Sequence, residues 1–170
     1  KQPERLALFG TGVSCAIIAQ YLQTGGTADA IVLESPFVDF RTYLRRYAGE
    51  QWGAFAGWWY AVLERQQSEL LQFPVYQLDL KEMSKDWTVP VLFVAGTDDH
   101  IAFLTETYGL YEGCPAPQKD LLLVKGARHG ELAVVGGDAY YNGISTFLNT
   151  VMPKRQKPSY RKRLALTDDL

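Results

Sequence analysis

Four short apolar runs are the main constraint on how this sequence of 170 residues can fold. They read RLALFG, AIVLES, VPVLFVAG and DLLLVKG, and each is almost continuously apolar instead of alternating with polar residues. Such runs are typical of strands that are buried on both faces, as the strands of a parallel sheet are. The sequence therefore predicts a parallel sheet whose strands are joined by crossover helices.

Segments with helical spacing separate the four runs. We expect helices at Val13–Leu22, at about Ala102–Glu112 and at Asp138–Val151, where apolar residues recur every three or four positions. The order is strand, helix, strand, long insert, strand, helix, strand, helix. It predicts an α/β fold with an open, mainly parallel sheet and flanking helices.

Composition limits the partners and the compartment. With 47% hydrophobic and 13% aromatic residues the chain can build the core of one globular domain. The net charge of −2 indicates no preference for nucleic acid or for an anionic membrane, so we expect neither as a partner. Cys15 and Cys114 do not form a disulfide framework, which favours a cytoplasmic protein. No run approaches the ~20 apolar residues that cross a bilayer.

Residues 37–87 form the long insert, which is helix-like and rich in tryptophan and tyrosine before Pro74 breaks it. One interpretation is a helical lid over a pocket in which Trp58 and Trp59 bind substrate. The other is that these aromatic residues simply pack the insert against the sheet. We assign residues 1–152, including the insert, to one domain.

Residues 153–170 form a basic tail with six cations between Lys154 and Arg163. The tail is either a solvated, mobile chain end or a segment that docks to an acidic partner. The chain begins at Lys1 instead of Met, so we expect processing or a longer polypeptide.

Three turns that follow apolar runs carry groups suited to nucleophilic catalysis. They read GTGVS, GTDDH and GARHG. In an open α/β sheet, ligands bind outside the carboxyl ends of the strands, where these turns lie. Their order is that of a nucleophile turn, an acid and a histidine, in which the acid orients the imidazole and the imidazole takes a proton from an attacking hydroxyl.

These segments resemble the α/β-hydrolase fold superfamily, in particular serine esterases and peptidase-like hydrolases of the dienelactone-hydrolase or fermentation-respiration-switch type. GTGVS aligns with the GxSxG nucleophile elbow. VPVLFVAGTDDHI and VKGARHGEL align with the acid and histidine segments, which implies Asp99 as the triad acid and His129 as the base. The resemblance extends to about Pro153 and implies only the C-terminal half of the fold, without its N-terminal strands.

The elbow can be read in two registers. The first places Gly12 at the nucleophile position and makes the Val13 N–H an oxyanion donor. The second reads GVSCA as a GxSxA elbow in which Ser14 attacks. The first fits better, because it leaves the usual strand length from Leu6 to Phe9. It predicts a positive φ at Gly12 and a missing nucleophile.

Two functions are consistent with these residues. The first is a hydrolase-like protein that keeps Asp99 and His129 but is inactive as written, either by nature or as a nucleophile mutant, and binds a small acyl or ester ligand or an assembly partner. The alternative is an active serine hydrolase of carboxyl esters or peptides, in which Ser14 or a group outside this sequence attacks. It would be completed by an N-terminal half outside this sequence.

The RLALFG strand would be left with an unpaired apolar edge. We therefore expect that an N-terminal half, a partner chain or a second copy covers it. We expect no cofactor, and no metal either, because His100 and His129 are the only histidines and neither has carboxylates at ligand spacing.

Overall fold

The computed structural model describes residues 5–71 and 78–153. In these ranges four parallel strands form one sheet in the order β1-β2-β3-β4. The strands are β1 (Ala7–Thr11), β2 (Ala30–Glu34), β3 (Val91–Gly96) and β4 (Lys119–Val124). All four predicted strands are confirmed, but the expected burial on both faces is wrong for β1 and β4, the edge strands of the described sheet, which are largely exposed or half-buried. The two central strands, β2 and β3, are buried along their whole length, which explains their continuous apolar runs.

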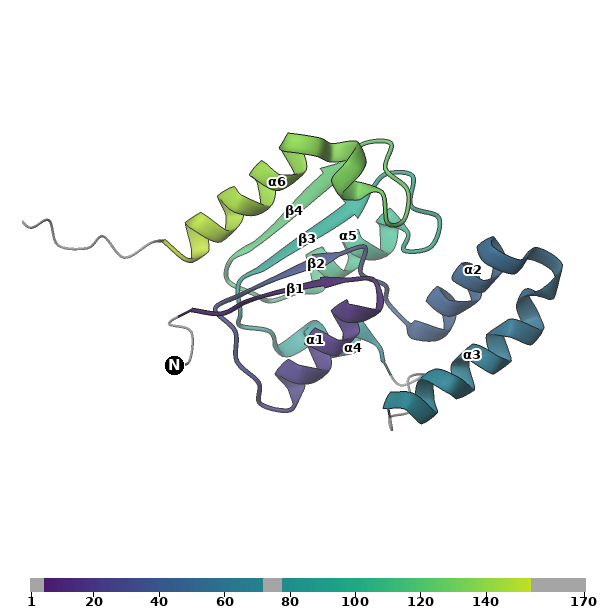
Figure 1. Ribbon diagram of the computed structural model, residues 1–170. Coiled ribbons are helices and arrows are strands. Elements are labelled where there is room, and N and C mark those ends of the chain that lie inside the picture. The colour runs from purple at the N-terminus through teal and green to yellow at the C-terminus, as the bar shows by residue number, and fades with distance from the viewer. Residues whose placement is uncertain (1–4, 72–77, 154–170) are drawn as a thin grey trace, which may run out of the picture.

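Helices cover both faces of the sheet (Figure 1). On one face lie α1 (Val13–Gln23), α4 (Leu80–Met83) and α5 (Leu104–Gly113), and on the other lies α6 (Leu132–Val151). A short turn of 3-10 helix, η3 (Ser84–Asp86), follows α4. The predicted α/β class with an open parallel sheet and flanking helices is therefore confirmed. No helix within the described ranges is long and apolar enough to span a membrane.

The last helix begins earlier than the sequence predicted. We expected it to begin at Asp138, but α6 begins at Leu132 and is interrupted at Gly137, where φ is 48° and ψ is −134°. Leu132, before the interruption, and Tyr140 and Phe147, after it, are the buried residues of the helix. Tyr140 is buried there, whereas Tyr141 is exposed.

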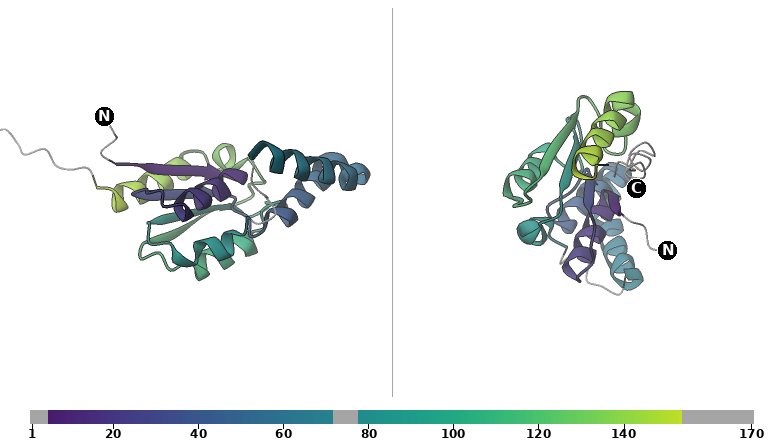
Figure 2. Two further views of the ribbon diagram at one scale, coloured as in Figure 1. Left: turned by 90° about the horizontal axis from the view of Figure 1, so that it is seen from below. Right: turned by 90° about the vertical axis from the view of Figure 1, so that its left-hand side faces the viewer.

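The insert forms a hairpin of two helices beyond the carboxyl ends of the strands. These are α2 (Phe40–Trp52) and α3 (Ala56–Leu71), joined by the 3-10 turn η1 (Gly53–Phe55). Figure 2 shows that the hairpin projects from the end of the sheet to which the arrow of β1 points. Pro74 and the tail from Lys154 onward lie outside the described residues.

The base of the hairpin is fixed to the sheet domain. Asp39 caps α2 by accepting a hydrogen bond from the Thr42 N–H at 2.9 Å. Arg46 forms two hydrogen bonds of 2.8 Å with Glu106 of α5 and donates a third to the carbonyl of Ile101 at 3.0 Å. The first turns of α2 are therefore held against the carboxyl edge of the sheet.

Candidate active site

Asp99 and His129 lie side by side at the carboxyl edge of the sheet. Asp99 follows β3, His129 follows β4, and Oδ2 of Asp99 is 2.9 Å from Nδ1 of His129. The turns that carry them are in close contact, because a Cβ added at Gly96 would lie 2.3 Å from the carbonyl oxygen of Ala127. Only glycine fits at position 96, and this close approach brings the acid and histidine turns together.

Three further features hold the Asp99 carboxylate in place. The residue is 4% exposed, and its Oδ1 accepts hydrogen bonds from the N–H groups of Ile101 at 2.9 Å and Ala102 at 2.8 Å. Burial by itself raises the pKa of Asp99. The hydrogen bond and charge of His129 and the two backbone donors outweigh burial, so the pKa lies below its ordinary value. An ionised Asp99 orients the imidazole so that Nε2 faces away from it.

Gly12 occupies the sharp turn between β1 and α1. Its φ is 53° and its ψ is −116°, and its N–H donates to the carbonyl of Glu34 at 2.9 Å. The predicted positive φ is confirmed. A Cβ at Gly12 would lie 3.7 Å from Nε2 of His129, so a hydroxyl on it could reach the imidazole. The assignment of the nucleophile position to Gly12 is compatible with this geometry and stays a prediction.

The close packing of Gly10 supports the same register. A Cβ at Gly10 would lie 2.9 Å from the carbonyl carbon of Ser14 and 2.8 Å from Cδ1 of Ile18. The absence of a side chain at Gly10 lets strand and helix approach each other, as the first glycine of an elbow motif is expected to do.

Ser14 and Val13 lie in the first turn of α1. The Ser14 side chain is exposed, and its hydroxyl makes no hydrogen bond with any described residue, His129 included. The Val13 N–H is the first of the helix and has no partner within it. The roles of Ser14 as nucleophile and of Val13 as oxyanion donor stay predictions.

Tyr43 is the site residue that the sequence did not reveal. Its hydroxyl is 3.3 Å from Nε2 of His129 and would be 2.9 Å from a Cβ at Gly12. Burial, followed by the charges of Tyr47 and Asp99, raises the pKa of Tyr43 to about 12, so the phenol is neutral at pH 7 and can donate to Nε2. One sequence signal could have indicated Tyr43. It lies one turn after Asp39, the capping residue of α2, and so at the end of the helix that is nearest to the strands.

Trp58 and Trp59 do not join this group of residues. A row of ring contacts leads from Tyr43 to Tyr47 at 6.4 Å, on to Trp52 at 6.3 Å and then to Trp59 at 5.3 Å. Both tryptophans belong to α3 at the outer end of the hairpin, and Trp58 is 66% exposed. Their substrate-binding role and the lid function of the hairpin stay predictions.

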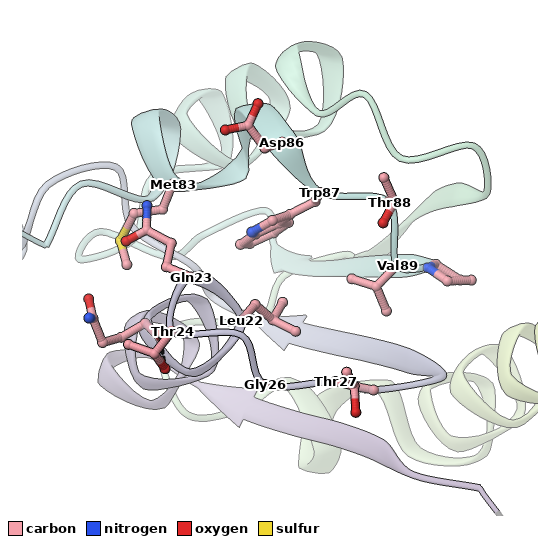
Figure 3. Close-up of a pocket in the computed structure, with 13 residues that line it drawn as sticks. Leu22, Gln23, Thr24, Gly26, Thr27, Met83, Asp86, Trp87, Thr88 and Val89 are labelled. Atoms are coloured by element: carbon pink, nitrogen blue, oxygen red, sulfur yellow. Dashed lines mark hydrogen bonds between the residues drawn. The ribbon is translucent and has the colours of Figure 1, made fainter.

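A cavity of about 800 Å³ lies elsewhere, at the amino-terminal edge of the sheet (Figure 3). It is lined by the end of α1, the loop before β2 and the segment before β3. The Asp99 and His129 turns follow the opposite ends of the strands, so this cavity is separate from the Asp99–His129 pair.

Solved structures that are similar to this fold include esterases and a lipase. An esterase from Pyrococcus furiosus matches 86% of this chain and 54% of its own length, with 17% sequence identity and a TM-score of 0.65. An esterase from Rhodococcus sp. matches 85% of this chain and 65% of its own length, with 18% identity and a TM-score of 0.56. A monoacylglycerol lipase from Paleococcus ferrophilus matches 87% and 69%, with 17% identity and a TM-score of 0.57.

This chain has an α/β-hydrolase fold. It spans a little over half the length of the Pyrococcus furiosus esterase, which agrees with a partial fold. Neither a protein-family model nor a curated protein sequence matches it. At these identities the likeness extends to the fold alone, and the activity must be argued from the residues of the site.

Proposed function

We propose that this α/β-hydrolase-like protein retains the acid and base of a serine-hydrolase triad, binds a small acyl or ester ligand beside them, and does not hydrolyse it. One observation carries the proposal: the position 3.7 Å from Nε2 of His129 belongs to Gly12, which has no side chain. Asp99 and His129 form the expected hydrogen bond, so the base is oriented but faces no serine hydroxyl.

Each missing part has a known effect on the chemistry. In a triad, the hydroxyl attacks the acyl carbon, the imidazole takes its proton, and N–H donors stabilise the oxyanion. Loss of a triad nucleophile lowers turnover by about 10⁶-fold. The Val13 N–H still supplies one oxyanion donor, so a carbonyl oxygen can be held at the elbow without being attacked.

The Tyr43 phenol is a poor substitute for the serine. Nucleophilic attack requires the conjugate base or a proton transfer to His129, and burial has raised the pKa of Tyr43 to about 12. A raised pKa makes deprotonation harder than for an ordinary phenol. We therefore infer that Tyr43 donates to His129 the hydrogen bond that the serine of a triad would donate. It does not attack the substrate.

The proposal is tested with 4-nitrophenyl butyrate and with a fluorophosphonate probe on the unmodified chain. We expect ester hydrolysis at the background rate, no burst and no covalent labelling. Methyl butyrate should still shift the imidazole signals of His129 in NMR spectra. A burst that Ser14→Ala abolishes would overturn both the assignment of the elbow to Gly12 and the inactive function.

The alternative function is a hydrolase completed at the edge of β1 by additional chain. It is favoured by Phe9, which is 51% exposed on the edge strand of the described sheet, and by the share of each esterase that the chain spans. A second copy at this edge would make the protein a dimer that Phe9→Glu dissociates in analytical ultracentrifugation. Labelling by the fluorophosphonate probe only in the associated state would favour this alternative.

A further inference from the structure

Five aromatic rings form a continuous row from the candidate site to the tip of the helical hairpin. The distances between successive ring centroids are 6.4 Å from Tyr43 to Tyr47, 6.3 Å to Trp52, 5.3 Å to Trp59 and 4.9 Å to Trp58. Each spacing lies in the range of about 4.5–7 Å in which aromatic rings contact each other. The row begins at a buried ring and ends at an exposed one, because Tyr43 is 6% exposed and Trp58 is 66% exposed. It therefore connects the site with the end of the hairpin that projects from the sheet (Figure 1).

The members of this aromatic row are all tyrosine or tryptophan. Phenols and indoles lose a single electron far more readily than the benzene ring of phenylalanine does. Phe37 and Phe40 also contact the ring of Tyr43, at 4.6 Å and 6.3 Å, but they lie outside the row. Electrons pass between two side chains when their π systems are in contact, as successive rings of the row are. An electron can therefore move stepwise between Tyr43 and Trp58.

Tyr43 also has a base for its proton. A phenol that loses an electron becomes a strong acid, so its oxidation is favourable only where a base accepts the proton. The hydroxyl of Tyr43 is 3.3 Å from Nε2 of His129, and Nδ1 of His129 is 2.9 Å from Oδ2 of Asp99. The ionised Asp99 holds the proton of the imidazole on Nδ1, which leaves Nε2 free to accept the phenolic proton. The imidazolium that forms is stabilised by the Asp99 carboxylate.

We propose that Tyr43 is a redox-active tyrosine, which the aromatic row connects to a one-electron oxidant at the tip of the hairpin. The oxidant takes one electron from Trp58, and electrons move along the row until Tyr43 has supplied the one that was lost. The phenolic proton passes to Nε2 of His129 in the same event. The oxidant thus gains one electron, the Asp99–His129 pair gains one proton, and Tyr43 becomes a neutral phenoxyl radical.

This activity gives the acid and the base a use that needs no nucleophile. It does not depend on the proposed function, because it rests on the contacts of Tyr43 and not on the residue at position 12. Burial of Tyr43 shields the radical from solvent and from other molecules, so the radical should live longer than one on an exposed tyrosine.

The test generates the oxidant by light in a solution of the full chain. Excited tris(bipyridine)ruthenium(II) loses an electron to pentaamminechlorocobalt(III), and the ruthenium(III) complex that results is a one-electron oxidant. Electron paramagnetic resonance of freeze-quenched samples then identifies the radicals. We expect a long-lived phenoxyl radical whose hyperfine pattern changes when Tyr43 is replaced by 3-fluorotyrosine. The radical should form more slowly in deuterated water, because the proton moves together with the electron, and a purely structural Tyr43 would show neither effect.

Two pairs of variants test the radical site and the route to it. Tyr43→Phe should abolish the long-lived signal, and Tyr141→Phe, at a tyrosine that is 58% exposed and outside the row, should keep it. Trp52→Leu interrupts the row, so the radical should no longer reach Tyr43. Phe55→Leu is the matched control on the hairpin, because Phe55 is 75% exposed and lies outside the row.

A long-lived phenoxyl signal that does not change with 3-fluorotyrosine at position 43 would overturn the proposal, as would the absence of any long-lived phenoxyl radical. Equal rates of Tyr43 oxidation in the unmodified chain and in Trp52→Leu would overturn the assigned route. The replacement by 3-fluorotyrosine changes a single ring atom, so this comparison holds even where Tyr43→Phe or Trp52→Leu does not fold.

Discussion

Replacing Gly12 by serine should destabilise the protein, although serine is the residue that a hydrolase elbow carries. The backbone of Gly12 has a φ of 53°, in the left-handed region that costs an L-residue about 1–2 kcal/mol. The new Cβ would also lie 2.9 Å from the hydroxyl of Tyr43, so the phenol must move away. Losing its hydrogen bond to His129 costs about 0.5–1.5 kcal/mol more.

These two contributions sum to about 1.5–3.5 kcal/mol of unfolding free energy. At about 2–4 °C per kcal/mol for a domain of this size, Gly12→Ser should lower Tm by about 3–14 °C. Thermal unfolding followed by circular dichroism measures the change. A Tm equal to that of the unmodified protein would refute the reasoning, because neither the strain nor the contact with Tyr43 would then exist.

The double variant Gly12→Ser/Tyr43→Phe separates the contact from the strain. Phenylalanine lacks the hydroxyl that meets the serine Cβ, so the two substitutions together should cost less than the sum of their separate costs. We expect a coupling free energy of about 1 kcal/mol in a double-mutant cycle from urea unfolding. Additive costs, within about 0.3 kcal/mol, would mean that Tyr43 does not occupy the space beside Gly12.

Two further predictions concern stability. The pKa of Asp99 lies below its ordinary value of 3.8. Its carboxylate, hydrogen-bonded to His129, therefore stabilises the fold above that pH, and this stabilisation is lost as the pH falls through the lowered pKa. Between about pH 5 and pH 2 the unmodified protein should therefore lose more stability in urea unfolding than Asp99→Asn does; parallel curves would contradict this. Gly96→Ala should lower the unfolding free energy by about 1–3 kcal/mol, because its Cβ would lie 2.3 Å from the carbonyl oxygen of Ala127. Gly49→Ala, at an α2 position where a Cβ meets no atom within 4 Å, should instead raise it by about 0.5–1 kcal/mol.

The sequence predicted the parts of the fold that depend on local pattern. Continuous apolar runs identify β2 and β3 because both faces of these strands are covered. The sharp turn after β1 was predictable because such a turn requires glycine or a strained residue at a fixed distance from the strand. The φ of Gly12 is positive, as predicted. Turn order was enough to bring Asp99 and His129 to one edge, since parallel strands share their carboxyl ends.

The rest depended on how helices leave the sheet, which no local pattern encodes. Tyr43 reaches His129 because Asp39 begins α2 and Arg46 anchors it to Glu106, a residue 60 positions away. The same direction of α2 carries the tryptophans of α3 away from the site. The cavity beside Trp87 is likewise formed by loops that are distant in sequence.

Gly12 and Tyr43 are best understood as a matched pair. A serine at position 12 and a tyrosine at position 43 would compete for the same few ångströms in front of Nε2 of His129. The phenol fills that space from α2 while the glycine leaves it free, so the imidazole keeps a hydrogen-bonding partner. If Gly12 stands at a nucleophile position, as we propose, Tyr43 compensates within the fold for the missing side chain, and we expect a serine alone to produce a steric conflict instead of a triad. Catalysis by this scaffold requires both changes, a hydroxyl at position 12 and its removal at position 43, together with a second oxyanion donor.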